Sequence, residues 1–206
     1  MIVLNFPQGS DEWRKARLGI PTASGFGRLI TPKTGKPSAS AEGYLHELLA
    51  EWMLGAPLDD ASSQWMERGK EIEAEARLYY QFQRDLDVAQ VGFCLRDDGL
   101  VGCSPDGLVG EDGLLEIKVP SAAVHMRYML TGQLEDDYRP QVQGQLWITE
   151  RKWLDLLSFN PVLPPVIIRC ERDEGFIAAL AGIVDPFIVR LEAAKAKLRG
   201  MHETQS

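Results

Sequence analysis

One predicted β-hairpin constrains the fold of this chain more than any other feature. Two apolar runs, Gly107-Leu108-Val109 and Leu114 to Val119, flank the turn Gly110-Glu111-Asp112-Gly113. Glycine-bounded turns between strand-forming runs are typical of antiparallel hairpins. Outside the turn, three ionisable residues stand among otherwise apolar residues and glycine, namely Asp106, Glu116 and Lys118. Charged side chains in so apolar a setting make the hairpin the most informative part of the sequence.

Alternation along the second strand fixes the direction of its side chains. Because alternate strand residues point the same way, Glu116 and Lys118 share a face about 6 to 7 Å apart, while Ile117 points into the core. Asp106, at the far end of the hairpin, can lie opposite Glu116. Converging carboxylates repel unless a cation lies between them, and oxygen ligands without nearby His or Cys favour Mg²⁺ or Mn²⁺ over zinc.

The neighbouring lysine completes a recognisable chemical set. Beside such an ion, Lys118 can hold or deprotonate a water and stabilise charge on a phosphate. The three residues therefore predict metal-assisted phosphodiester hydrolysis. The alternative is an ordinary salt bridge on a surface hairpin, since the D-x9-E-x-K spacing alone occurs in many unrelated proteins.

The remaining sequence predicts helices, then a central mixed sheet, then helices again, which indicates an α/β or α+β sandwich. Ser10 is a candidate N-cap, and Gly55 a candidate helix stop. The expected helices are Ser10 onward, Thr22 to Ile30, Ser40 to Leu54, Ser63 to Arg84, Ser121 onward, Arg139 to Thr149 and Asp173 to Arg199. The expected strands are Val88 to Leu95, Leu100 to Cys103, the hairpin, Trp153 to Phe159 and Val166 to Arg172.

Length and composition are those of an ordinary globular protein. We expect residues 1–206 to form one domain, without a membrane span or export signal. The three cysteines, Cys94, Cys103 and Cys170, contain no CxxC pair, which argues against a zinc ribbon or an iron–sulfur cluster and favours a reducing cytoplasm.

Net charge bears on the choice of partner. The value of −8 is unpromising for a nucleic-acid binder. Residues 1–36, however, hold six basic and two acidic side chains, so this segment is +4 while the remainder is −12. A basic patch beside an acidic body suits an enzyme that grips DNA locally and binds metal with carboxylates, although solvated surface charge explains the sums equally well.

Six ordered blocks give the chain a specific resemblance. It resembles the PD-(D/E)XK nuclease superfamily, and within it the phage lambda exonuclease and YqaJ-like viral recombinase family, over most of its length. The blocks are Gly9-Ser10-Asp11-Glu12-Trp13; Arg17-Leu18-Gly19 with Thr22-Ala23-Ser24; Gly69-Lys70 with Glu73 and Ala76-Arg77; Cys103 to Leu108; Glu116-Ile117-Lys118; and Gln141-Val142-Gln143 with Trp147. The resemblance implies a restriction-endonuclease-like α/β core with a mixed sheet of about five strands flanked by helices.

The resemblance also implies roles for single residues. Asp106 and Glu116, with the main-chain carbonyl of Ile117, would bind metal, and Lys118 would activate the attacking water. Glu73 would contact a second metal ion or its water, and Gln141 would orient a catalytic group. Plainer alternatives stay open for these two, a solvated helix carboxylate and a buried amide satisfied by the backbone.

A 5′-phosphate site is implied at Arg17, Ser24 and Ser104. A guanidinium, hydroxyls and a helix N-terminus together can bind an anion. Alternatively, Arg17 pairs with an acidic neighbour and Ser24 is only an N-cap. The family's pattern has a further arginine after the Lys118 block, which this chain lacks, so either His125 or Arg127 substitutes or the end-phosphate requirement is weaker. We expect His125 to be a plain surface histidine.

The implied function is digestion of one strand of linear duplex DNA from 5′ to 3′, leaving a 3′ tail for phage-type recombination. Two Mg²⁺ ions, replaceable by Mn²⁺, a homotrimeric ring and a single-strand annealing partner in the bacterial cytoplasm follow from the same resemblance. Three alternatives remain: another nuclease of the superfamily, such as an endonuclease or helicase-associated enzyme; a non-catalytic DNA-end-binding module; and a small acidic protein with no DNA role.

Overall fold

The computed structural model of the chain describes residues 1–58 and 64–203, with side chains for residues 1–58 and 71–201. The predicted helix start at Ser63 lies outside the described residues. The side chains of the Gly69-Lys70 block lie outside them as well.

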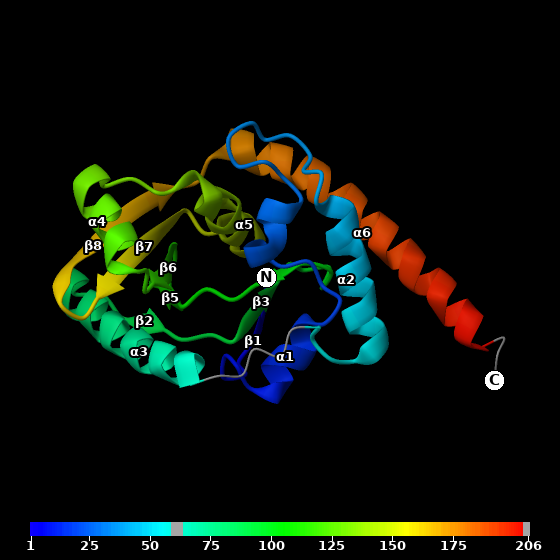
Figure 1. The fold of residues 1–206 in the computed structure, drawn as a ribbon, viewed down its shortest axis with the longest axis horizontal. Helices are drawn as coiled ribbons and strands as arrows, with labels where there is room; N and C mark the ends of the chain where they lie inside the picture. The colour runs from blue at the N-terminus through cyan, green and yellow to red at the C-terminus, as the bar shows by residue number, and fades with distance from the viewer. Residues whose placement is uncertain (59–63, 204–206) are drawn as a thin grey trace.

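A five-stranded mixed sheet is the larger of the two sheets and lies on the left in Figure 1. Its order is β2-β5-β6-β7-β8, and only the β6–β7 pair is parallel. The strands are β2 (Val88–Ala89), β5 (Gly107–Val109), β6 (Gly113–Lys118), β7 (Trp153–Asn160) and β8 (Leu163–Glu171). The predicted hairpin is therefore confirmed as β5–β6, and its second strand is also the first strand of the parallel β6–β7 pair.

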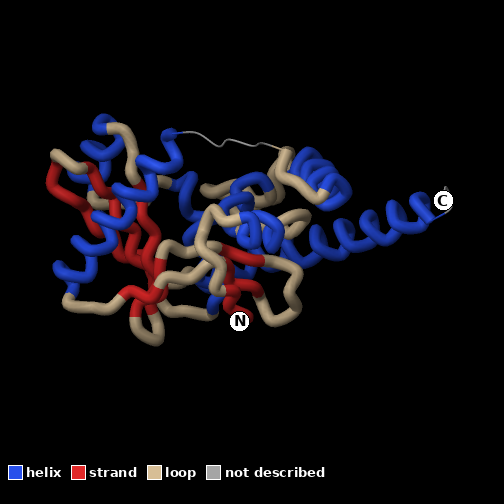
Figure 2. Tube along the Cα trace, turned by 90° about the horizontal axis from the view of Figure 1, so that it is seen from below, coloured by secondary structure: helices blue, strands red, loops and turns tan. Residues whose placement is uncertain are grey.

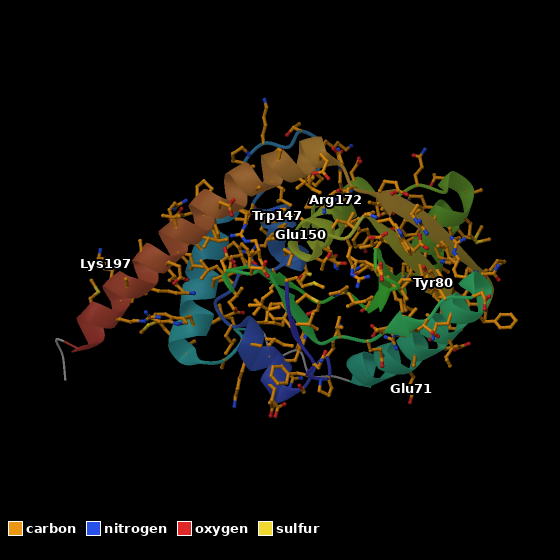
Figure 3. All side chains as sticks on the ribbon, turned by 180° about the vertical axis from the view of Figure 1, so that it is seen from behind. Glu71, Tyr80, Trp147, Glu150, Arg172 and Lys197 are labelled. Carbon is orange, nitrogen blue, oxygen red and sulfur yellow. The ribbon has the colours of Figure 1, made fainter. Side chains whose placement is uncertain are left out.

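Helices cover both faces of this sheet. Helix α3 (Gln64–Arg84) packs Ala76 and Tyr80 against Leu115 and Ile117 of β6. Figure 3 shows Tyr80 turned toward the sheet, where its hydroxyl donates to buried Asp155 at 2.7 Å. The opposite face is covered by α4 (Ala122–Thr131) and α5 (Arg139–Thr149). This layering is the predicted α/β arrangement of a mixed sheet flanked by helices.

A second group of elements, drawn from both ends and the middle of the chain, packs beside this sheet. It holds a three-stranded sheet in the order β1-β3-β4, which was not predicted as a separate sheet. Its members are β1 (Ile2–Leu4), β3 (Phe93–Leu95), β4 (Gly102–Cys103), α1 (Asp11–Arg17), the 3₁₀ helix η1 (Ala23–Arg28), α2 (Ala41–Leu54) and α6 (Glu174–Glu203). A further 3₁₀ helix, η2 (Asp136–Tyr138), precedes α5.

The expected strand from Val88 to Leu95 is wrong, because this run forms two strands in different sheets. Strand β2 pairs with β5, whereas β3 pairs with β1. The break falls at Gly92, where an added Cβ would lie 2.0 Å from the Phe6 carbonyl oxygen. The close approach of the N-terminal segment therefore separates the two strands.

Smaller differences concern element ends. Strand β8 starts at Leu163 and so includes two prolines, which an edge strand tolerates. Helix α6 continues to Glu203 through Pro186, and its C-terminal part extends beyond the body in both views (Figure 1, Figure 2). No helix among the described residues combines the length and apolar character that crossing a bilayer requires.

Candidate active site

Asp106 lies at the mouth of the β5–β6 hairpin. Its backbone N–H donates to the Leu115 carbonyl at 3.0 Å, one residue beyond the Gly107–Leu115 pair. Its Oδ2 accepts from the Ile117 backbone N–H at 2.6 Å. The hairpin register therefore brings the Asp106 carboxylate to the level of Glu116, as the sequence predicted.

Glu116 is buried, and polar side chains surround its carboxylate. Its Oε1 accepts from Lys118 Nζ and from Gln141 Nε2, each at 2.7 Å, and its Oε2 accepts from Gln145 Nε2 at 2.7 Å. Lys118 also donates to Gln141 Oε1 at 3.3 Å. The predicted trio of Glu116, Lys118 and Gln141 therefore forms one hydrogen-bonded cluster between β6 and α5.

Alternation along β6 explains this cluster. Leu115 and Ile117 pack in the apolar layer under α3. Leu114 packs on the other face with Val142 and Leu146 of α5. Glu116 and Lys118 follow Leu114 at two-residue intervals, so they reach the same face and meet the start of α5. The prediction that Ile117 points into the core is confirmed.

The surroundings of Asp106 disfavour the ionised form of its carboxylate. Burial, and next the charge of Glu116, raise the pKa of Asp106 well above its ordinary value, and the charge of Glu73 adds to this shift. The backbone hydrogen bond from Ile117 only partly opposes it. A cation near Asp106 would relieve this repulsion.

The site favours the charged form of Lys118, whereas it disfavours the charged form of Asp106. Burial disfavours the charged lysine, but the attraction and hydrogen bond of Glu116 outweigh burial and raise the pKa of Lys118. The side chain is 22% exposed and lies 4.9 Å above the ring of Tyr138. Lys118 is consequently held as an ammonium group at the edge of the site.

Glu73 reaches the site from helix α3. It is half-buried and lines the same pocket as Asp106, a cavity of about 800 Å³ whose walls include Trp13, Arg77 and Gln90. The charge of Glu73 also contributes to the raised pKa of Asp106. The structure thus brings Glu73 to the Asp106 side of the hairpin.

The donor set fits a hard divalent cation with an incomplete protein shell. Among the described residues, no three His, Cys, Asp or Glu side chains stand close enough to form a metal cage. The residues that would hold an ion are the carboxylates of Asp106 and Glu116 with the Ile117 carbonyl. Magnesium commonly keeps several waters and takes one or two carboxylates from the protein, which matches this set. The observation that favours a cation here is the hairpin register, which brings the Asp106 carboxylate to the level of buried Glu116.

Arg17 and Ser104, two residues of the predicted phosphate site, are in direct contact. Arg17 Nη1 donates to Ser104 Oγ at 2.9 Å, and the guanidinium lies 4.3 Å above the ring of Trp13. Burial of the guanidinium lowers the pKa of Arg17. Trp13 Nε1 donates to the same Ser104 oxygen at 3.0 Å, so three side chains converge there.

The alternative that Ser24 is only an N-cap is wrong. The N-cap position of η1 belongs to Thr22, and Ser24 is an exposed residue within that helix. Its hydroxyl lies 3.2 Å from the Thr22 hydroxyl. The contacts of the Arg17–Ser104 pair therefore do not include Ser24 in the described structure.

His125 is not a surface residue, and the prediction that it is one is wrong. It is fully buried, with Nδ1 2.7 Å from Ser158 Oγ and Nε2 3.0 Å from the Pro164 carbonyl oxygen. Helix α4 packs this ring against β7 and β8, and both ring nitrogens make hydrogen bonds there. Arg127 is 61% exposed and pairs with Glu135 at 2.8 Å.

The basic N-terminal segment is partly neutralised by acidic neighbours. Arg14 pairs with Asp11 at 3.1 Å, Arg28 pairs with Glu47, and Lys33 lies 3.4 Å from Asp136. Half of the six basic side chains in residues 1–36 therefore have acidic partners.

Two polar residues of the site had no predicted role. Gln145 binds the second oxygen of Glu116, and Arg77 lies beside Asp106. The four-residue spacing of Gln141 and Gln145 on a predicted helix was the available signal for Gln145, because such residues share a face. Arg77 stands four residues after Glu73 and shares its face in the same way.

A family model described as the YqaJ-like viral recombinase domain matches residues 12–152. This range contains Arg17, Glu73, the hairpin and helix α5. A comparison with curated protein sequences finds no match.

Solved structures resemble most of the chain. An alkaline exonuclease, LHK-Exo from Laribacter hongkongensis, is 34% identical over 96% of this chain and 100% of that protein, with a TM-score of 0.82. The same protein in complex with dAMP matches with a TM-score of 0.83. A phage-related exonuclease from Haemophilus somnus, 15% identical over 87% of this chain and 96% of that one, has a TM-score of 0.63 and shares the fold.

Proposed function

The chain belongs to the YqaJ-like viral recombinase family, and we propose that it is a magnesium-dependent exonuclease acting on linear double-stranded DNA. The observation that carries the proposal is the cluster of Asp106, Glu116 and Lys118 at the hairpin mouth. Exonuclease activity is further supported by the alkaline exonuclease that is 34% identical over nearly the whole chain. The dAMP bound to that relative is consistent with a deoxyribonucleotide product.

Each residue of the cluster has a distinct proposed task. Asp106, Glu116 and the Ile117 carbonyl would bind magnesium, and Glu73 would serve a second ion or its water. When bound, Mg²⁺, or Mn²⁺ in its place, would act as a Lewis acid that makes water a better nucleophile and stabilises charge on the leaving oxygen. Gln141 and Gln145 fix the Glu116 carboxylate by donating to its two oxygens.

Lys118 would act as a charged hydrogen-bond donor. Its raised pKa keeps it protonated, so it is better suited to holding the attacking water and the phosphate than to removing a proton. Gln141 accepts from Lys118 and donates to Glu116, so it contacts both members of this ion pair.

The proposed polarity is 5′ to 3′, with a 3′ single-stranded tail as the product. The contact between Arg17 and Ser104 supports a 5′-phosphate site, because a poorly solvated guanidinium beside a hydroxyl suits a dianion. The tail would be used in phage-type recombination by strand annealing.

Family membership supports three further proposals. The protein would form a homotrimeric ring around DNA, cooperate with a single-strand annealing protein and work in the bacterial cytoplasm. Exposed apolar side chains, including Phe82 on α3 and Leu130 on α4, offer surface that such an assembly could cover. Light scattering of the purified protein gives the subunit number.

The class of nuclease is tested by comparing linear duplex, nicked circular and covalently closed circular DNA in Mg²⁺. The proposal predicts mononucleotide release from linear DNA and none from closed circles. Internal cleavage of circles would make the protein an endonuclease of the same superfamily. Binding to duplex ends without any cleavage would make it an end-binding module.

A further inference from the structure

One positively charged side chain, that of Arg77, lines the pocket beside Asp106 and has no role in the proposed mechanism. The wall of this pocket carries two carboxylates, those of Glu73 and Asp106, together with the amides of Gln8 and Gln90. Among the described residues that line it, Arg77 is the only cation. A DNA strand that reaches Asp106 through this pocket must bring its phosphates close to two acidic side chains, so a cation in the wall has electrostatic value.

Neutral oxygen atoms hold the Arg77 guanidinium in place. Its Nε donates to the main-chain carbonyl of Asp106 at 3.3 Å. With the Gln90 amide oriented so that its oxygen faces Arg77, that oxygen accepts from both terminal nitrogens. These contacts fix the plane of the guanidinium without neutralising its charge, and they use three of its five N–H donors.

The position of Arg77 on α3 is itself firmly set. One turn further along the helix, buried Tyr80 bonds to Asp155 of β7, and Ala76 is fully buried against the sheet. Arg77 is half-buried beside these anchors. A guanidinium that is pre-oriented and still charged is suited to bidentate recognition of phosphate.

We infer that Arg77 is a second phosphate-binding residue of the site, separate from the Arg17–Ser104 pair, and that Gln90 is the positioning residue that orients it. Its ligand is a phosphodiester group of the DNA strand lying in the pocket beside Asp106. The inference rests on the proposed function in that it takes DNA as the substrate.

Binding in EDTA tests the inference without depending on cleavage. The affinity for a fluorescent duplex with a 5′-phosphate end is measured by anisotropy from about 25 to 200 mM KCl. Arg77→Met should reduce the slope of log K against log [salt] by about 0.9, the contribution of one lost phosphate contact. Arg77→Lys should retain the slope, because it keeps the charge, but bind more weakly because it loses the fork.

Gln90→Ala tests the positioning role. It should retain the salt slope and raise KM several-fold in Mg²⁺ with kcat close to wild type. The matched control is Arg84→Met, which removes a cation from the far end of the same helix, 3.7 Å from Asp155 and outside the pocket. This control should retain the wild-type slope and KM. Circular dichroism melts show that each variant is folded.

An unchanged salt slope in folded Arg77→Met, with the loss confined to kcat, would overturn the inference and make Arg77 a support for the Asp106 main chain. A wild-type protein that binds DNA but does not cleave it contradicts the proposed function instead, while its salt slope still decides the role of Arg77. Failure of the wild-type protein to bind duplex DNA even at about 25 mM salt would contradict both the proposed function and the role of Arg77.

Discussion

The ammonium nitrogen of Lys118 lies 2.7 Å from Oε1 of Glu116, two residues earlier on the same strand. Both side chains are largely withdrawn from water, at 22% and 6% exposure. Strand geometry forces the pair together, because alternate residues share a face. The pair therefore places a fixed positive charge beside one of the proposed metal ligands.

Replacing Lys118 should stop catalysis without preventing DNA binding. Lys118→Met removes the charged donor, and the rate of nucleotide release should fall by about 10²- to 10⁴-fold. Single-turnover digestion and anisotropy measured together separate the two effects. Lys152→Met, which removes an exposed lysine paired with Asp112 at 2.8 Å, should retain both properties. Normal turnover in Lys118→Met would contradict the mechanism.

Gln145 and its neighbour Gln143 offer a matched pair on helix α5. Gln145→Ala leaves Oε2 of buried Glu116 without its donor, so it should cost about 1 to 3 kcal/mol of stability and also weaken Mg²⁺ binding. Gln143→Ala breaks the contacts of Gln143 with Glu171 and Asp173 and should cost stability alone. Calorimetric Mg²⁺ titration of both variants distinguishes them, and equal Mg²⁺ affinities would remove Gln145 from the site.

Asp106→Asn should abolish cleavage and yet stabilise the metal-free protein by about 1 kcal/mol. Burial and the charge of Glu116 raise the pKa of Asp106, so the folded state disfavours its ionised form. With a raised folded pKa, wild-type stability is lost as pH rises through that pKa, and the advantage of Asp106→Asn should grow in that direction and vanish near pH 4.

The measurement is the melting temperature in EDTA from about pH 4 to 8, where each kcal/mol corresponds to roughly 2 to 4 °C. Adding Mg²⁺ should stabilise wild type and leave Asp106→Asn nearly unchanged. A variant less stable than wild type throughout this pH range would show that Asp106 is not electrostatically strained.

Arg17→Ala should slow digestion of 5′-phosphorylated ends more than of 5′-hydroxyl ends. The guanidinium bonds to Ser104 Oγ at 2.9 Å and is shielded by the Trp13 ring, so its attraction for a dianion is weakly screened. Arg14→Ala, which removes a neighbouring arginine paired with Asp11, is the control. Equal slowing of both kinds of end would remove Arg17 from the phosphate site.

The sequence predicted the hairpin and its charged residues because both depend on local rules. The glycine-bounded turn sets the register, and two-residue alternation sends Glu116 and Lys118 to one face. Helix α5 was also predicted, from Arg139 to Thr149, and these are its observed bounds. The site could be outlined from these two elements.

Features that depend on distant contacts could not be predicted in this way. His125 is buried because α4 packs onto β7 and β8, which the sequence of α4 does not reveal. The run from Val88 to Leu95 divides because Phe6 approaches Gly92 across more than 80 residues of chain. The proposed role of Arg77 could not be predicted either, because it depends on a contact with Asp106, 29 residues further along the chain.

The most direct test of the account is digestion of linear duplex DNA in which one strand is labelled, with a 5′-phosphate or a 5′-hydroxyl end, in Mg²⁺ and in EDTA. The account predicts nucleotide release from the 5′-phosphorylated strand in Mg²⁺, much slower release from the 5′-hydroxyl strand, and none in EDTA. Release that persists in EDTA, or that proceeds from the 3′ end, would contradict it.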